Sequence, residues 1–184
     1  MKKIAINGFG RIGRSFFRQA FGSADFDIVA VNDLTDTKTL AYLLKYDSVY
    51  GRYGKTVTSA DGKIAVDGQD IKVLAEKDPA KLPWKDLDID IVVESTGFFT
   101  SSDKAKAHLE AGAKRVVITA PAKGDVDTLM AGVNDDKFAV AGPITCNASC
   151  TTNSVAPVMQ ILLDNFGIQK ASMATIHGYT ATQK

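Results

Sequence analysis

The sequence predicts an α/β protein built on a Rossmann-type, doubly wound and mostly parallel sheet. Three observations carry this prediction. Short apolar runs alternate with helical patterns, a glycine-rich stretch of the form G-x-G-x-x-G joins the first run to the first helix, and an acidic residue ends the second run. We expect a small antiparallel hairpin insertion in this domain, followed by the start of a second, α+β catalytic domain.

The first third of the chain is predicted to form strand, helix, strand and helix in that order. Residues 3–7 and 27–32 are short apolar runs, whereas residues 11–21 and 39–46 show helical spacing. Because parallel neighbours need a crossover connection, the short links predict parallel strands. The first helix is expected to end at Gly22 and to bury one apolar face, made of Ile12, Phe16, Phe17 and Ala20.

Two Asp-Gly pairs mark the expected insertion. Asp61-Gly62 and Asp67-Gly68 flank the short runs at residues 63–66 and 70–74. Asp-Gly readily supplies the positive φ angles of a tight hairpin turn, so we predict an antiparallel hairpin here.

The α/β pattern then resumes towards the end of the chain. Thr100 and Asp103 have the spacing of a capping box at the start of a helix. His108, within that helix, is expected to be exposed to solvent. A last helix begins near Cys150 and is expected to place Val155, Met159, Leu162 and Phe166 on one face. The predicted strands are residues 89–94, 115–119, 139–141 and 171–176, and the predicted helix before Cys150 is residues 102–111.

Composition excludes several classes of partner. The 184 residues are 45% hydrophobic and 23% charged with a net charge of +1, which gives no basic face for nucleic acid. We find no apolar run long enough to cross a membrane, no secretory signal and no metal-ligand pattern. Cys146 and Cys150 do not make a disulfide framework, so a cytoplasmic location is expected.

The glycine stretch has the features of a dinucleotide-binding loop. Gly8 allows the tight turn after the strand, Gly10 lets the backbone approach a pyrophosphate, and Gly13 lets the helix pack closely on the strand. Asp33, which follows Asn32, lies 20 residues after Gly13, where a carboxylate can bind the adenosine ribose hydroxyls. It would repel a 2′-phosphate, so NAD is favoured over NADP. The alternative is a plain glycine turn with a solvated aspartate.

The segment around Cys150 is a candidate nucleophile site. A thiol at a helix N-terminus meets the positive end of the helix dipole, which favours the reactive thiolate. His177 is the candidate base, and the hydroxyls of Ser149 and Thr151 could bind an anion. Read without their neighbours, Cys150 is better explained as a buried, inert cysteine and His177 as a structural residue; the hydroxyls grouped around Cys150 favour the functional interpretation.

Five segments together resemble phosphorylating glyceraldehyde-3-phosphate dehydrogenase, and the resemblance runs the whole length of the chain. The cysteine segment is the most specific of them and the glycine loop the least. The segments are residues 7–14 (NGFGRIGR), 32–34 (NDL), 95–97 (STG), 148–153 (ASCTTN) and 180–184 (TATQK).

The resemblance implies a role for each matching position. Cys150 is implied to be the nucleophile and His177 the base, with glyceraldehyde 3-phosphate and inorganic phosphate as substrates. Ser149, Thr151 and Thr180 are implied to bind the phosphates. The implied NAD-lining positions are Gly8, Phe9, Gly10, Arg11, Ile12, Gly13, Asn32, Asp33, Lys77, Ser95, Thr96, Gly97 and Thr119; a solvated loop lysine is the other interpretation of Lys77.

The resemblance also sets expectations for the whole protein. It implies an NAD-binding domain at residues 1–149, the start of a catalytic domain at 150–184, and a homotetramer at full length. Family members often carry a second cysteine where this chain has Ser154. Because no closing element follows Lys184, we expect a chain cut before the catalytic domain is complete, with little activity alone. A dehydrogenase acting on erythrose 4-phosphate and a non-catalytic NAD-binding fragment remain alternatives.

Overall fold

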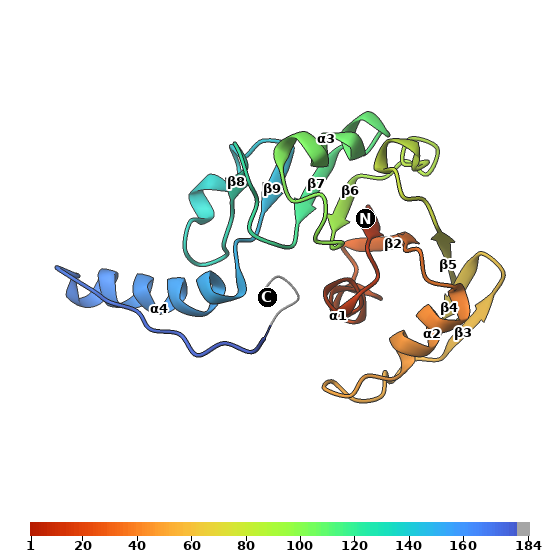
Figure 1. Ribbon diagram of the computed structural model, residues 1–184, viewed down its shortest axis with the longest axis horizontal. Coiled ribbons are helices and arrows are strands. Elements are labelled where there is room, and N and C mark those ends of the chain that lie inside the picture. Colours follow the sequence, from red (N-terminus) through yellow and green to blue (C-terminus); the bar gives the residue numbers. More distant parts are fainter. Residues whose placement is uncertain (180–184) are drawn as a thin grey trace.

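The computed structural model describes residues 1–179, in which the strands form one nine-stranded sheet (Figure 1). The strands, in the order β3-β4-β5-β2-β1-β6-β7-β9-β8, are accompanied by four α-helices in this part of the chain. The strands are β1 Lys2–Asn7, β2 Phe26–Asn32, β3 Val57–Ala60, β4 Lys63–Val66, β5 Gln69–Leu74, β6 Ile91–Glu94, β7 Arg115–Ile118, β8 Asp127–Thr128 and β9 Ile144–Cys146. The helices are α1 Arg11–Ala20, α2 Thr37–Lys45, α3 Ser102–Glu110 and α4 Cys150–Phe166, with 3₁₀ turns η1 Pro79–Lys81 and η2 Asp135–Lys137.

The central strands have the connectivity of a doubly wound sheet. β5, β2, β1, β6, β7 and β9 are parallel neighbours in that order, which is the 3-2-1-4-5-6 order of a Rossmann domain. The order reverses between β1 and β6, and in open sheets a ligand binds at the carboxyl ends of the strands at such a point. The predicted fold class is confirmed.

The hairpin insertion is also confirmed. β3 and β4 pair antiparallel, as do β4 and β5. The turn between β4 and β5 is made by Asp67 and Gly68, whose φ angles are 48° and 85°. These positive angles are those of the tight turn that the Asp-Gly pair predicts.

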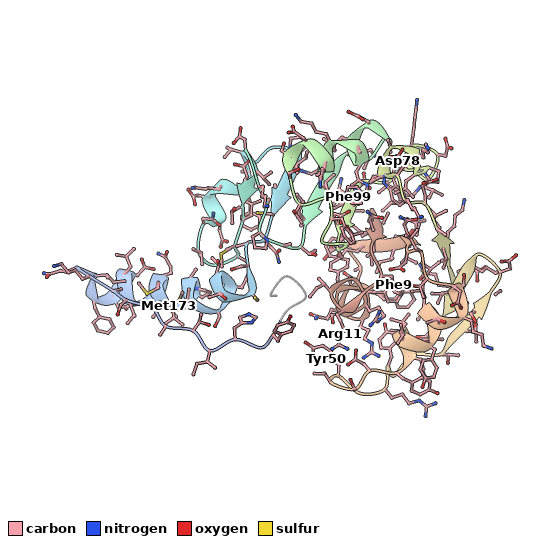
Figure 2. All side chains as sticks on the ribbon, viewed as in Figure 1. Phe9, Arg11, Tyr50, Asp78, Phe99 and Met173 are labelled. Carbon is pink, nitrogen blue, oxygen red and sulfur yellow. The ribbon has the colours of Figure 1, made fainter. Side chains whose placement is uncertain are left out.

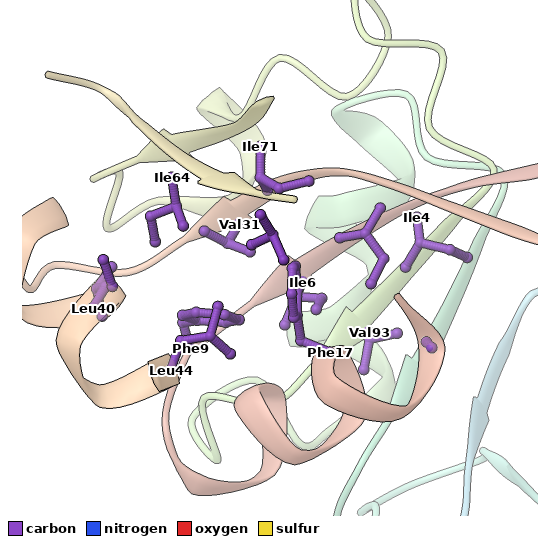
Figure 3. Close-up of a cluster of buried hydrophobic side chains, with 14 residues drawn as sticks. Ile4, Ile6, Phe9, Phe17, Val31, Leu40, Leu44, Ile64, Ile71 and Val93 are labelled. Carbon is purple, nitrogen blue, oxygen red and sulfur yellow. The ribbon is translucent and has the colours of Figure 1, made fainter. Parts of the chain in front are cut away.

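Helices cover the two faces of the sheet separately. α1 and α2 pack on one face through Phe17, Leu40 and Leu44, against side chains such as Ile6 and Val31 (Figure 3). On the other face, Trp84 and the segment around it pack on Ala5 and Val92, while α3 packs on β7. Each inner strand is therefore apolar on both sides, as buried parallel strands require.

The last helix departs from this layered body. α4 extends away from the sheet, and the chain after it runs back alongside it (Figure 1). None of its residues is buried, and Leu163 and Phe166 are 53% and 81% exposed. Several large apolar side chains exposed along one helix are typical of a surface that binds other protein.

Two predicted strands are wrong. Residues 139–141 form a turn in which Val140 is 83% exposed, and the edge of the sheet is supplied by β8 and β9 instead. Residues 171–176 have no ladder partner among the described residues and are not a strand. Three small apolar residues in a row do not distinguish a strand from a turn, and pairing depends on a neighbour that the local sequence does not contain.

Three predictions about helices also need correction. The cap of α3 is Ser101, whose hydroxyl accepts a hydrogen bond from the Lys104 N–H, and not Thr100. Ile12 on α1 is 55% exposed and does not belong to the buried face. His108 was expected in solvent but is fully buried, because it lies one turn after Ala105 on the inner face of α3.

Candidate active site

The glycine loop lies at the carboxyl end of β1, where the strand order reverses. Gly8 has φ of 90°, and a Cβ there would lie 2.6 Å from the backbone nitrogen of Thr96. A Cβ on Gly13 would lie 2.1 Å from the carbonyl oxygen of Gly8. Around Gly10 there is nothing within 4 Å of an added Cβ, so a ligand has room to approach the backbone there.

The carboxylate of Asp33 supports this loop from the end of β2. One of its oxygens accepts a hydrogen bond from the Phe9 N–H at 2.8 Å, and the other accepts from the Thr35 N–H at 3.0 Å. A carboxylate has about four acceptor positions, so two remain for the hydroxyls of a ribose.

A cavity of about 520 Å³ opens between the ends of β1, β2 and β6. It brings together seven predicted cofactor-lining residues: Gly8, Gly10, Asn32, Asp33, Lys77, Ser95 and Thr96. It is also lined by residues that sequence reasoning missed: Asn7, Leu34, Glu76, Phe98 and Phe99. The two phenylalanines directly follow the Ser-Thr-Gly segment, which was the available signal, and an apolar lining suits an adenine ring.

Six of the predicted cofactor residues do not line this cavity: Phe9, Arg11, Ile12, Gly13, Gly97 and Thr119. Phe9 buries its ring in the core, so only its backbone faces the loop. The side chain of Arg11 is engaged outside the cavity: it lies 2.6 Å from Asp47 and stacks over Tyr50 (Figure 2). Gly97 has φ of 77° and serves the turn after β6.

A second cavity, of about 580 Å³, connects α1 with the start of α4. Ile12 and Thr119, two further predicted cofactor positions, line it together with Ser149 and Cys150. The exposure of Ile12 is thus explained by its place at this cavity.

Cys150 is the first residue of α4, and it is exposed. Its Sγ lies 2.9 Å from Nε2 of His177, and Nδ1 of the same ring lies 2.7 Å from the carbonyl oxygen of Gly178. Nδ1 therefore donates to that carbonyl, which leaves Nε2 to exchange a proton with the sulfur. The structure brings together the two predicted catalytic residues from positions 27 residues apart.

The pair shifts both pKa values towards a thiolate and an imidazolium. The hydrogen bond from His177 is the largest cause that lowers the pKa of the Cys150 thiol, and the charge of His177 and hydrogen bonds from Thr151 act in the same direction. The bond to the Gly178 carbonyl, followed by the bond to Cys150, raises the pKa of His177. Both shifts favour the thiolate–imidazolium pair over the neutral pair.

The start of α4 is held by polar contacts. The hydroxyl of Ser149 caps the helix by accepting from the Thr152 N–H at 3.0 Å. The side-chain amide of Asn153 donates to the carbonyls of Asn147 and Ser149, which bracket Ala148 in a left-handed conformation with φ of 63°. Strained backbone of this kind often accompanies a functional site, and Asn153 is a site residue that the sequence alone did not reveal.

Thr151 lines a third cavity, of about 430 Å³, together with Cys150 and His177. The predicted phosphate-binding residue Thr180 lies outside the described residues. Cys146 is buried beside the Thr128 hydroxyl, and both cysteines are free thiols.

We predict that the alkylation rate of Cys150 by iodoacetamide rises at a lower pH than that of an ordinary cysteine. The thiolate reacts, and it is populated above the lowered pKa of the thiol. Replacing His177 with Asn removes the main cause of the shift, so the midpoint should move up and the rate at neutral pH should fall. Mass spectrometry of the alkylated peptide measures this, with Cys146→Ser as a control; equal midpoints with and without His177 would contradict the pairing.

Fold and site together define a class: a dinucleotide-binding Rossmann domain joined to a cysteine–histidine pair. Residues 2–102 match the family model "Glyceraldehyde 3-phosphate dehydrogenase, NAD binding domain", and residues 149–184 match "Glyceraldehyde 3-phosphate dehydrogenase, C-terminal domain". The chain belongs to the glyceraldehyde-3-phosphate dehydrogenase family, and its N-terminal part is the NAD-binding domain of that family.

Curated relatives agree over nearly the whole chain. Proteins named glyceraldehyde-3-phosphate dehydrogenase are 52% identical over 186 residues in Thermotoga maritima, 55% over 183 in Chlamydia muridarum and 52% over 187 in Borreliella burgdorferi. These matches cover 98% to 100% of this chain and 55% to 56% of the relatives. The chain thus spans about half the length of the curated relatives it matches. Within residues 1–179, no helix combines the length and apolarity that crossing a membrane requires.

Proposed function

We propose that this chain is the NAD-binding and thiol-bearing part of an enzyme that oxidises glyceraldehyde 3-phosphate, with uptake of inorganic phosphate, to 1,3-bisphosphoglycerate. The observation that carries the proposal is the 2.9 Å contact between Cys150 Sγ and His177 Nε2 at a helix N-terminus, beside a dinucleotide domain. The family supplies the identity of the aldehyde.

The cavity at the ends of β1, β2 and β6 suits NAD. Open space beside Gly10 leaves room for a pyrophosphate, and the spare acceptor positions of Asp33 suit the adenosine ribose. Ile12 and Thr119 line the cavity that continues towards Cys150, which suits the nicotinamide end. NAD supplies an acceptor for the hydride that leaves the substrate.

Cys150 performs the covalent part of the reaction. Its thiolate attacks the aldehyde carbon, and the resulting oxyanion takes a proton to give a thiohemiacetal. Loss of the hydride from that carbon, and of the hydroxyl proton to His177, leaves a thioester on the sulfur. Phosphate then attacks the thioester carbonyl, the acyl phosphate leaves, and Cys150 returns to the thiolate. Thr151, beside both residues, and Ser149 are the proposed ligands of the attacking phosphate.

The setting of the whole protein follows from the same reasoning. A low-pKa, exposed thiol stays reduced in the cytoplasm, which is the proposed location. A homotetramer is proposed from the family. The exposed apolar side chains of α4, such as Leu163 and Phe166, are consistent with coverage by further protein.

Asp33→Ala tests the cofactor assignment. We expect NAD affinity to fall by about tenfold or more, because a carboxylate that accepts from ribose hydroxyls and from the Phe9 N–H is lost. Affinity for NADP should fall less, since the repulsion of its 2′-phosphate disappears as well. Titrations of both nucleotides give the two dissociation constants; an unchanged NAD constant would show that Asp33 does not bind the ribose.

The substrate is tested in a chain continued by the remaining part of the Thermotoga maritima relative. Phosphate-dependent NADH formation should be faster with glyceraldehyde 3-phosphate than with erythrose 4-phosphate. The reverse preference would favour the second aldehyde as the substrate.

A further inference from the structure

A row of buried polar side chains crosses the sheet directly beneath the cofactor cavity. Asn32, Asn7 and Glu94 occupy paired positions at the ends of the neighbouring strands β2, β1 and β6. Asn32 is 5% exposed and the other two are 1% exposed, while His108 of α3, fully buried, lies against Glu94. Such groups are costly to bury unless every one is hydrogen-bonded, so their arrangement is tightly specified.

The donor and the acceptor of each hydrogen bond around Glu94 can be assigned. The indole N–H of Trp84 donates to Nδ1 of His108 at 3.0 Å, so in the neutral ring the proton is on Nε2. That Nε2 donates to Oε2 of Glu94, also at 3.0 Å. From the other side, the amide of Asn7 donates to the same oxygen at 2.6 Å.

The second oxygen of Glu94 is occupied by the cavity wall. Oε1 accepts from the Thr96 N–H at 2.8 Å and also from the Thr96 hydroxyl. Thr96 in turn is the residue whose backbone nitrogen leaves no space for a Cβ on Gly8. The carboxylate therefore connects a buried network to the point at which β6 closes against the glycine loop.

The network continues to the opposite wall of the cavity. Asn32 donates one amide hydrogen to Oδ1 of Asn7 at 2.7 Å and the other to the carbonyl of Glu76 at 2.9 Å. Its own oxygen accepts from the Glu76 N–H at 2.9 Å. Both donors of Asn32 are thus committed, so this side chain anchors the loop that carries Lys77 and has no hydrogen left to donate to a cofactor.

We propose that Glu94 is a positioning residue of the cofactor cavity, whose carboxylate holds Thr96 against Gly8. The inference rests on the proposed NAD site. His108 acts through Glu94 by presenting a donor to it while accepting from Trp84. Because the donors of Asn7, His108 and Thr96 converge on the Glu94 carboxylate, the network has a single consistent arrangement, and that arrangement fixes the wall beside the glycine loop.

Glu94→Gln keeps the shape of the side chain but breaks this consistency. If the new amide nitrogen faces Asn7 and His108, it meets two donors, and reversing either of them would break its bond to Asn32 or to Trp84. If the amide is flipped, the Thr96 N–H loses its acceptor. In both cases a buried hydrogen-bonding group in the network that holds the cavity wall loses its partner, although the volume of the side chain is conserved.

Two variants at position 108 separate the effect of the lost hydrogen bonds from the effect of changed packing. His108→Gln can still accept from the indole through its oxygen and donate to Glu94 through its nitrogen, whereas His108→Leu can do neither. Trp84 is the only tryptophan in the chain, so its emission spectrum reports the state of this bond without a label. Ile64→Val, a core substitution in the hairpin insertion, is the control for general destabilisation.

The experiment measures NAD dissociation constants by calorimetry, at a temperature at which urea titrations show every variant folded. We expect binding about tenfold weaker for Glu94→Gln and His108→Leu, and within about twofold of the starting protein for His108→Gln and Ile64→Val. Trp84 emission should shift with His108→Leu and stay in place with His108→Gln.

The outcomes distinguish the positioning role of Glu94 from the proposed NAD site on which it rests. If the unsubstituted protein shows no saturable NAD binding, the proposed cofactor site itself is wrong. If it binds but Glu94→Gln binds equally well, or if Ile64→Val weakens binding as much as Glu94→Gln, the positioning role is overturned.

Discussion

Gly13→Ala should abolish NAD binding and strongly destabilise the domain. The added Cβ would lie 2.1 Å from the carbonyl oxygen of Gly8, a backbone atom that cannot rotate aside as the end of a flexible side chain could. Gly8 is itself confined, since its own position lies against the backbone of Thr96. The overlap can be relieved only if α1 separates from β1, at a cost of about 3 kcal/mol or more. Urea unfolding and an NAD titration measure the two effects.

Gly10→Ala is the matched control for this prediction. An added Cβ at Gly10 meets nothing within 4 Å, so the free energy of unfolding should stay within about 0.5 kcal/mol of the original value. NAD affinity should still fall, because the methyl group occupies the space through which a pyrophosphate approaches the backbone. If Gly13→Ala retained normal stability, or if Gly10→Ala bound NAD unchanged, the glycine loop would not have the two separate functions assigned to it.

The parts of the fold that could be predicted are those set by local chemistry. Gly8, Gly10 and Gly13 have distinct spatial constraints, and the Asp67-Gly68 turn has the positive φ angles that its residues favour. Buried parallel strands are apolar on both faces, and this is visible in residues 27–32 without knowledge of their neighbours.

The errors concern features that depend on distant partners. His108 was misplaced because its environment is made by Trp84 and Glu94, which lie 24 and 14 residues earlier. The segment at 171–176 has the composition of a strand but no pairing partner among the described residues. A side chain's hydrogen-bond partner and a strand's neighbour are tertiary properties, and sequence spacing does not encode them.

In the candidate site too, the sequence predicted individual residues, whereas their contacts depend on tertiary structure. The sequence predicted Cys150 as the nucleophile and His177 as its base, and only the structure places Sγ and Nε2 2.9 Å apart. Asn32 was predicted to bind the cofactor and lines the cavity, and the structure adds that it donates its two amide hydrogens to Asn7 and to the Glu76 carbonyl. The remaining site residues stay predictions about ligand contacts, which the variants above address.

Cys150→Ser should remove aldehyde oxidation almost completely. A serine hydroxyl keeps the shape of the thiol but ionises far less readily, so the thiolate that His177 stabilises has no counterpart. Loss of the covalent step should lower kcat/KM by on the order of 10³-fold or more. NAD binding at the glycine loop should be unaffected, because the substitution leaves the cavity at the ends of β1, β2 and β6 intact.

The most direct test of the account compares NADH formation by the Cys150 protein and its Cys150→Ser variant, each continued by the rest of the Thermotoga maritima relative. With glyceraldehyde 3-phosphate, NAD and phosphate present, we predict turnover by the first and almost none by the second, at equal NAD affinity. A serine variant that forms NADH at the full rate would contradict the claim that hydride leaves a carbon bonded to this sulfur.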